Sequence, residues 1–331
     1  MRTSFTALLT LLAFKSIAQG LIFDNTSFEK REELELTRAT LPTRYSLKEY
    51  TPALIYPQSI SDCVAHAFGM ARTVTIAKNL KITDRTKISL LLTSPWHMYY
   101  RLSSSADQNC SQGLNIEKAA ESALNDGFVM LSNVEYPNYY PFSSSILCKS
   151  VSRGFYPPSI YDDNNNARKL AFDKVYAIRT IDQLKQALAQ GMPVVVGLMI
   201  PKSFESCKSS TFTLSSYDKQ NLIYGHAMLV IGYNDLLNGG SLEILNSWGD
   251  QWGASGFTNI RYVDFLATVG AAYACYDAPT YNQENSIESF STDVSKEEIA
   301  QKANRIFQQL DERNNDFNNS NIIRLFDSNI K

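Results

Sequence analysis

A cysteine, a histidine and an asparagine in this chain have the residue types and surroundings that thiol catalysis requires. A thiol becomes an effective nucleophile when it is ionised, when a base takes its proton, and when donors face the developing oxyanion. Cys63 opens a stretch of helical periodicity, and the positive end of a helix dipole favours the thiolate. His226 opens the apolar run His226–Tyr233, and Asn246 follows it. An asparagine oxygen can accept from the far imidazole nitrogen and so fix the tautomer of the base.

Each of these residues also has a purely structural interpretation. Cys63 could be a small buried hydrophobe, and His226 could be a core histidine at the start of a strand. We expect structural roles for the other two histidines, His66 and His97. Cys63 and His66 could ligate a metal ion, but no second Cys/His cluster supplies the remaining ligands, so the sequence predicts no metal site.

The segment that begins at Asn246 favours the catalytic interpretation. It reads NSWGDQWGASG and contains two Trp-Gly pairs, at Trp248 and Trp252. A tryptophan beside a histidine–asparagine hydrogen bond shields it from water and strengthens it. Either tryptophan alone could instead belong to a turn in the core.

Composition describes an ordinary globular protein. The chain has 331 residues, 44% of them hydrophobic and 19% charged, with a formal net charge of −2. No basic patch or acidic tail stands out, so the sequence predicts no nucleic-acid partner.

The N-terminus predicts export. Arg2 precedes the apolar stretch Phe5–Phe14, and the small residues Ser16 and Ala18 stand where a signal peptide over residues 1–18 would be cleaved. The alternative is a membrane anchor, but the stretch has about half the length that a spanning helix needs. No later segment has 18 uncharged apolar residues. We therefore expect a secreted or periplasmic, otherwise extracytoplasmic, protein with no membrane contact after cleavage.

Three further parts follow the signal. Residues 19–40 form a short charged leader, in which Glu29–Arg38 could be a solvated helix. Residues 41–277 form the main domain, and residues 278–331 form a C-terminal extension with one helix, Val294–Asp311.

The main domain divides into a helical half and a sheet-rich half. The first half has helical periodicity over Asp62–Lys81, Ser94–Leu102 and Asn115–Asn125. The second half has a helix over Ile181–Gln190 and strands over Pro193–Ile200, His226–Tyr233, Leu242–Asn246, Phe257–Tyr262 and Thr268–Tyr276. This order indicates an α+β fold with a cleft between two subdomains.

Three sequence blocks resemble those of the papain-like cysteine peptidases (peptidase C1). GHAMLVIGY and LEILNSWGDQWGASGFTNIRY are similar to the family's histidine and asparagine blocks. PQSISDCVAHAFGMA resembles its nucleophile block, closest to bacterial versions with Cys-Val-Ala-His. The chain departs from the family pattern at Val64, where a Trp is usual, and at Ile60, where an earlier Cys is usual. The resemblance extends over roughly Leu41 to Asp277.

The resemblance implies a papain-like fold with a helical half, a β-barrel-like half and the active-site cleft between them. It implies a peptide or protein substrate and no cofactor. Cys63 would be the nucleophile, His226 its base, and Asn246 the residue that orients the base. Gln58 would complete the oxyanion hole with the Cys63 N–H, although it lies one position closer to Cys63 than in most of the family.

The resemblance also implies substrate contacts. Trp248 would shield the histidine–asparagine pair, and Trp252 would lie on the leaving-group side of the cleft. Cys110-Ser111-Gln112-Gly113 resembles the family's Cys-Asn-Gly-Gly, so Gly113 would let the substrate backbone pair closely with the enzyme.

The five cysteines fit the same resemblance. In an oxidising compartment four could pair and one remain free. The family pattern implies the disulfides Cys110–Cys148 and Cys207–Cys275, which leaves Cys63 free.

The family's large inhibitory propeptide has no counterpart in the short leader. We expect the leader, or the Val294–Asp311 helix, to cover the cleft as an inhibitory segment. Two other functions remain open: a related acyl-transfer enzyme, and an inactive peptide-binding homologue on the same fold.

Overall fold

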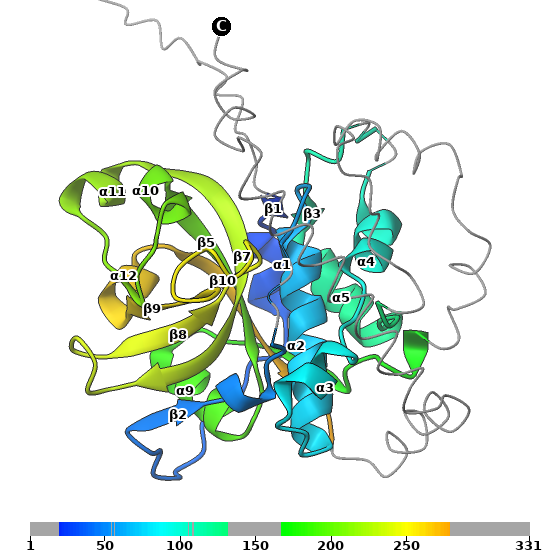
Figure 1. Cartoon of the computed structure of the whole chain (residues 1–331), viewed down its shortest axis with the longest axis horizontal. Coiled ribbons are helices and arrows are strands. Elements are labelled where there is room, and N and C mark those ends of the chain that lie inside the picture. The colour runs from blue at the N-terminus through cyan, green and yellow to red at the C-terminus, as the bar shows by residue number, and fades with distance from the viewer. Residues whose placement is uncertain are drawn as a thin grey trace, which may run out of the picture.

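The computed structural model describes residues 20–131 and 167–278, apart from residues 54, 56, 105 and 108. A helical half and a sheet half lie side by side, and helix α2 (Cys63–Asn79) runs along the boundary between them (Figure 1). The α+β architecture predicted from the sequence is confirmed.

Helix α2 is the central element of the helical half, and nearly all of its side chains are buried. It packs against both helices and strands, which explains why its side chains are buried on every side. The other elements of this half are η1 (Lys48–Tyr50), α3 (Arg85–Ser89), α4 (Pro95–Leu102), β3 (Leu114–Asn115) and α5 (Ile116–Asn125). Asn115 caps α5, because its side-chain oxygen accepts from the N–H groups of Glu117 and Lys118.

The sheet half contains one eight-stranded sheet in the order β4-β10-β5-β7-β8-β9-β6, with β2 paired to β7. Its strands are β2 (Arg44–Ser46), β4 (Lys174–Ala177), β5 (Val194–Pro201), β6 (Thr211–Phe212), β7 (Leu222–Asn234), β8 (Ser241–Leu245), β9 (Phe257–Arg261) and β10 (Val269–Tyr276). Its helices are α9 (Ile181–Ala189), α10 (Lys202–Glu205), α11 (Ser216–Gln220) and α12 (Tyr262–Leu266). Strands β5, β7 and β10 form the centre of the sheet, and they are the continuous apolar runs of the sequence.

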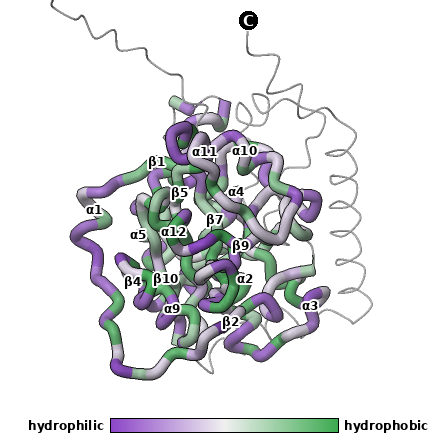
Figure 2. Tube along the Cα trace, turned by 90° about the vertical axis from the view of Figure 1, so that its left-hand side faces the viewer, coloured by the Kyte–Doolittle hydropathy of each residue, from purple (hydrophilic) through white to green (hydrophobic). Residues whose placement is uncertain are grey.

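The hydrophobic core is continuous across the two halves. It joins α2 and α5 to β5, β7, β8 and β10, and the hydrophobic stretches gather toward the middle of the trace (Figure 2). Among the described residues, no helix combines the length and apolar character needed to cross a bilayer.

The leader differs from its predicted structure. A helix expected over Glu29–Arg38 is found instead at α1 (Asn25–Lys30), where the Asp24 side chain accepts from the Ser27 N–H as an N-cap. Beyond α1 the chain is extended, because Glu33 pairs with Ala177 of β4. The predicted helix Val294–Asp311 and the signal peptide lie outside the described residues.

The predicted disulfide Cys207–Cys275 is wrong, because both thiols are free and buried. Cys275 lies on β10, whereas Cys207 lies beside Thr258 of β9, and β5, β7 and β8 run between those two strands. Cys148 lies outside the described residues, so its pairing with Cys110 stays a prediction.

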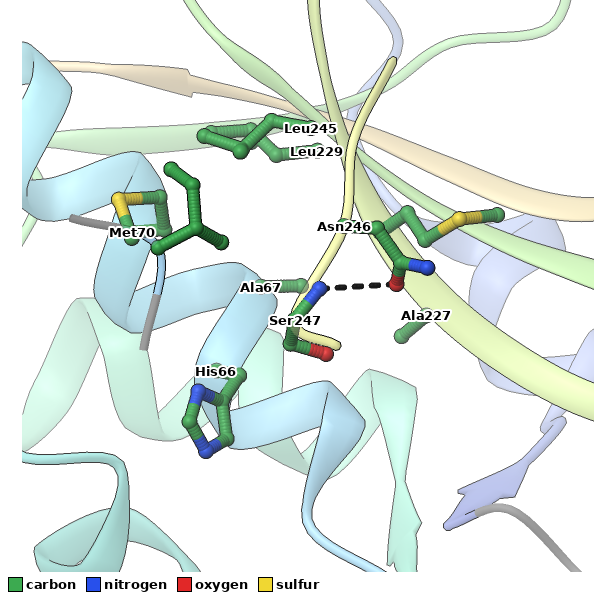
Figure 3. A pocket seen from close by; sticks show the side chains of 10 residues that line it. His66, Ala67, Met70, Ala227, Leu229, Leu245, Asn246 and Ser247 are labelled. Atoms are coloured by element: carbon green, nitrogen blue, oxygen red, sulfur yellow. Dashed lines mark hydrogen bonds between the residues drawn. The ribbon is translucent and has the colours of Figure 1, made fainter. Parts of the chain in front are cut away.

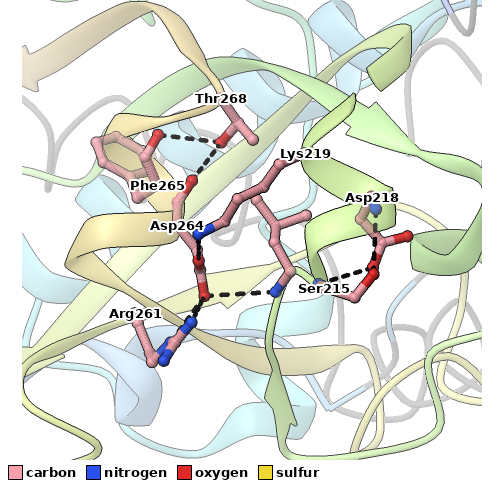
Figure 4. A network of polar contacts seen from close by, with 8 residues as sticks. Ser215, Asp218, Lys219, Arg261, Asp264, Phe265 and Thr268 are labelled. Atoms are coloured by element: carbon pink, nitrogen blue, oxygen red, sulfur yellow. Dashed lines mark hydrogen bonds and ion pairs between the residues drawn. The ribbon is translucent and has the colours of Figure 1, made fainter. Parts of the chain in front are cut away.

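The buried carboxylate of Asp264 connects three segments of the sheet half. Asp264 of α12 is fully buried and accepts from the Arg261 guanidinium at 2.8 Å and from the Leu214 N–H at 3.4 Å, while the Lys219 ammonium lies 3.4 Å away (Figure 4). Burial raises the pKa of Asp264, but the Arg261 contact and these other groups together hold it below its usual value. The carboxylate therefore joins α12 to α11 and to the chain before it.

Replacing Asp264 with asparagine should lower the free energy of unfolding by about 2 kcal/mol, because a charge-assisted hydrogen bond to Arg261 is lost. Urea denaturation measures the loss. Glu121→Gln, at an exposed position of α5, is the matched control and should change stability little. Equal stability of the two variants would contradict this role of Asp264.

Candidate active site

Cys63 is the first residue of α2, and its thiol is free and fully buried. The thiol points at strand β7, where the backbone N–H of Ala227 donates to Sγ at 3.4 Å. Asp62 occupies the N-cap position, but its side chain makes no capping hydrogen bond and instead lies 3.5 Å from His66 Nε2. The N-terminus of α2 thus holds the thiol against Ala227, the residue that directly follows His226 on β7.

His226 is held by Asn246 through a hydrogen bond of 2.7 Å between Nε2 and Oδ1. The same Oδ1 accepts from the Ser247 N–H at 2.8 Å, so this atom is an acceptor and Nε2 must carry the proton. Nδ1 of His226 has no hydrogen-bond partner among the described residues. The lone pair of Nδ1 is therefore available to accept a proton. His226 directly precedes Ala227, whose N–H contacts the Cys63 thiol.

Two tryptophans cover this pair on one side. The Trp248 ring stacks on the His226 imidazole, with ring centroids 4.5 Å apart and planes 23° apart. Trp252 meets Trp248 edge-on at 5.6 Å and donates from Nε1 to the Phe204 carbonyl at 2.9 Å. The stack restricts both the orientation of the imidazole and the access of water to the His226–Asn246 hydrogen bond.

Gln58 lies on the loop before α2 and is fastened to the segment that follows Asn246. Its backbone N–H donates to the Ser247 carbonyl at 2.8 Å, and its side-chain Oε1 accepts from the Ser247 hydroxyl at 2.7 Å. Its Nε2 donates to the Ile60 carbonyl at 3.0 Å. Sequence reasoning missed the role of Ser247, which ties Gln58 to the Asn246 segment; its position directly after Asn246 was the only signal.

Burial shifts both reacting groups toward their neutral forms. Burial, reinforced by the Asp62 charge, raises the pKa of Cys63 to about 12, although the Ala227 N–H opposes the shift. Burial also lowers the pKa of His226 to about 4, against the effect of the Asn246 hydrogen bond. In this closed form the site holds a neutral thiol and a neutral imidazole near pH 7.

A small cavity lies between α2, β7 and the end of β8, lined by residues that include His66, Met70, Asn246 and Ser247 (Figure 3). Its volume of about 10 Å³ has room for a single water molecule. It is therefore too small to receive a substrate side chain. Within the part of the chain that is described, no three His, Cys, Asp or Glu side chains gather as a metal site requires.

The leader occupies the side of the site where Gly113 lies. Strand β1 (Leu21–Ile22) runs parallel to β3, and the Leu114 N–H donates to the Gly20 carbonyl at 2.9 Å. A Cβ on Gly113 would come within 2.3 Å of Gly20, and a Cβ on Gly20 within 2.2 Å of the Ser61 carbonyl oxygen. The leader backbone therefore lies between Gly113 and the residues just before Cys63, a placement that the sequence alone did not reveal.

A sequence profile described as papain family cysteine protease matches residues 69–274, which include His226 and Asn246 but begin after Cys63. The uncharacterized peptidase C1-like protein L477 of Acanthamoeba polyphaga mimivirus is 35% identical over 86 residues, or 25% of this chain and 26% of that protein. Pro-cathepsin H of Medicago truncatula is 32% identical over 76 residues, or 23% and 22% of the two chains. These matches span about a quarter of the length of each curated relative.

Solved structures share the fold. Xylellain, a cysteine protease from Xylella fastidiosa, is 21% identical with a TM-score of 0.61, over 80% of this chain and 97% of that one. Procathepsin B S9 from Trypanosoma congolense is 14% identical with a TM-score of 0.58, over 79% and 87%. Digestive procathepsin L 3 of Tenebrio molitor is 18% identical with a TM-score of 0.54, over 74% and 73%. The described architecture is thus the two-subdomain papain-like fold, and with the profile match over most of the domain, the chain belongs to the papain family of cysteine proteases.

Proposed function

We propose that this protein is an exported cysteine peptidase in which Cys63 is the nucleophile, His226 the base and Asn246 the residue that orients the base. The observation that carries the proposal is the 2.7 Å contact between His226 Nε2 and Asn246 Oδ1, which leaves Nδ1 to serve a thiol held beside it. The Cys-Val-Ala-His block at Cys63 groups it with bacterial members of the family. The predicted signal peptide supports an extracytoplasmic location.

The reaction uses the imidazole twice. Nδ1 of His226 takes the Cys63 proton, and the thiolate forms a bond to the scissile carbonyl carbon. The oxyanion is met by the Cys63 N–H and the Gln58 amide. His226 returns the proton to the amine as the C–N bond breaks, then accepts one from the water that hydrolyses the acyl-enzyme and regenerates the thiol.

The leader acts as the inhibitory segment in this proposal. It holds the position beside Gly113 that a substrate backbone would need, and the reacting groups beneath it are buried and neutral. A closed precursor of this kind keeps the thiol from reacting during export.

Polar contacts anchor the leader well away from the cleft. Arg31 donates from Nε to the buried Glu117 carboxylate at 2.6 Å. Glu33 accepts from Gln183 Nε2 at 2.5 Å and from Arg179 Nε at 2.9 Å. After residue 34 the chain is exposed through residue 40, which makes this stretch a suitable site for proteolytic maturation.

Leu21→Asp should release inhibition in the full-length protein, because a carboxylate cannot remain in the apolar position that Leu21 fills. We expect peptidase activity on a fluorogenic peptide to rise at least tenfold. Ile22→Asp introduces the same charge at the exposed neighbour, where the side chain is 44% exposed, and should leave activity low. Equal activity of the two variants would show that the leader does not inhibit.

In the Leu21→Asp protein, Cys63→Ala should abolish turnover, and Asn246→Ala should lower kcat/KM about 100-fold because the tautomer of the base is no longer fixed. Mass spectrometry after treatment with an epoxide-type thiol inhibitor should find the adduct on Cys63. Cys207→Ser is the control, since that buried free thiol lies outside the site. Turnover that survives Cys63→Ala would refute the mechanism.

The buried His226 should make the closed protein sensitive to acid. Its pKa falls from 6.5 to about 4 on folding, so below pH 6.5 the unfolded chain binds a proton that the folded chain does not. Stability should therefore decrease as the pH falls from 6.5 toward 4. Urea denaturation at pH 7.5 and 4.5 should show a smaller decrease in His226→Ala than in the unaltered protein; an equal decrease would contradict the buried neutral imidazole.

A further inference from the structure

The segment Cys110–Gly113, which leads into strand β3, has a backbone conformation that needs support. Cys110 has a φ of 50° and Gly113 a φ of 75°, so the segment begins and ends with a left-handed residue. This conformation costs free energy for a residue with a Cβ, and it persists only where surrounding contacts enforce it. Strand β3 follows directly, and its Leu114 N–H binds the Gly20 carbonyl of the leader. Whatever holds the segment in place therefore also holds a strand that binds peptide backbone.

A buried carboxylate supplies this support. Asp107 Oδ1 accepts from the Ser111 N–H at 3.0 Å, and Asp107 Oδ2 accepts from the Gln112 N–H at 3.3 Å. The Tyr99 hydroxyl donates to the same Oδ2 at 2.7 Å. Asp107 is 6% exposed and Tyr99 is 1% exposed, so water competes little for these hydrogen bonds. The two carboxylate oxygens thus hold consecutive N–H groups in the middle of the segment.

Tyr99 holds the carboxylate from helix α4. Its ring stacks on that of Trp96 in the same helix, with centroids 6.2 Å apart and planes 7° apart. Burial and the Asp107 carboxylate raise the pKa of Tyr99, while the Gly113 N–H opposes the shift. The hydroxyl therefore keeps its proton and remains a donor to Asp107. The effect of the Gly113 N–H places the last residue of the segment beside the same hydroxyl.

The segment also contacts the residues that precede the nucleophile. The Cys110 carbonyl accepts from the Ser61 N–H at 3.0 Å, and Ser61 lies two positions before Cys63. The segment therefore connects the start of α2 to the strand that binds peptide. A small displacement of the segment would move a bound peptide relative to the thiol, and such a misplacement lowers the efficiency of the reaction.

We infer that Asp107 is a positioning residue of the peptidase, which together with Tyr99 fixes the Cys110–Gly113 segment so that substrate backbone can pair with Gly113 in register with Cys63. This inference rests on the proposed function. Both side chains act through the backbone of the segment, and neither has to touch the substrate. Loss of the carboxylate should weaken the binding of peptides that reach Gly113 and leave the reactivity of the thiol unchanged. A side chain that only stabilised the fold would lower the amount of active enzyme and leave its KM as it was.

The test measures KM and kcat in the full-length Leu21→Asp protein, in which the leader no longer competes with substrate. Asp107→Asn should raise KM for a fluorogenic peptide about tenfold, because an amide of the same shape turns an N–H toward one of the present donors. Tyr99→Phe keeps the ring and both backbone contacts of Asp107, and should raise KM about threefold. Alkylation of Cys63 by iodoacetamide, which is too small to reach Gly113, should keep its rate in both variants.

Ser104→Ala is the matched control. It removes a hydroxyl that accepts from the Ala106 N–H at 3.2 Å in the same loop, but that hydroxyl has no contact with the Cys110–Gly113 segment among the printed distances of the fold. KM and the alkylation rate should both stay as in the Leu21→Asp protein.

Methylated substrates test the backbone pairing directly. N-methylation of each peptide amide before the cut in turn should find one position at which kcat/KM of the Leu21→Asp enzyme falls about tenfold, because a backbone hydrogen bond is lost. In Asp107→Asn the same methylation should cost about twofold or less, since the pairing is already weakened and the two changes are not additive.

The outcomes separate the two proposals. A raised KM with a reduced methylation penalty supports the inference. An Asp107→Asn enzyme that keeps the parent's KM and methylation penalty overturns it and leaves the peptidase function intact, as does slower alkylation of Cys63. Since KM does not depend on how much of a variant folds, Tyr99→Phe decides by the same measurements if Asp107→Asn yields no folded protein. A Leu21→Asp protein that turns over no peptide and takes no inhibitor on Cys63 overturns both proposals.

Discussion

The site depends on one contact between elements distant in sequence: the first turn of α2 against the buried segment of β7. The Ala227 N–H meets the Cys63 thiol there, across 164 positions of sequence. Both groups sit on regular elements packed in the core, so their relative position is fixed by the packing of helix on sheet and does not rely on loops. Asn246 inherits its position from the same sheet, because β8 pairs with β7 and delivers it to His226.

The same packing explains why the Cys63 thiol and the His226 imidazole are neutral in this form. A helix terminus beside a strand interior excludes water, and a thiolate and an imidazolium both lose solvation there. Burial therefore opposes the charged forms more strongly than the local donors favour them. The thiolate–imidazolium pair can therefore form only when the cleft opens to water or substrate.

Much of this architecture could be predicted from the sequence, because long apolar periodicities decide it. The helix at Cys63, the strand at His226 and the buried run of β5 were all expected close to where they lie. Short strands such as β3, β4 and β6 escaped prediction, because partners distant in sequence define them. The same limit applied to Cys207 and Cys275: the family pattern suggested a pair, but only the strand order shows how far apart the two thiols lie. The contacts that Leu21 and Phe23 make with the sheet could not be predicted either, because two apolar residues alone show no periodicity.

The leader is fastened at several separate places: β3, Glu117, the Ala177 bridge and Gln183. While it is part of the chain, its effective concentration at the cleft is far above that of any dissolved peptide, on the order of millimolar for short linkers. A cut in the exposed stretch after residue 34 breaks a covalent bond but none of these contacts. The cut leader then becomes an ordinary ligand, whose occupancy follows its bulk concentration. At high protein concentration the nicked protein would therefore stay closed, and dilution would itself open the cleft.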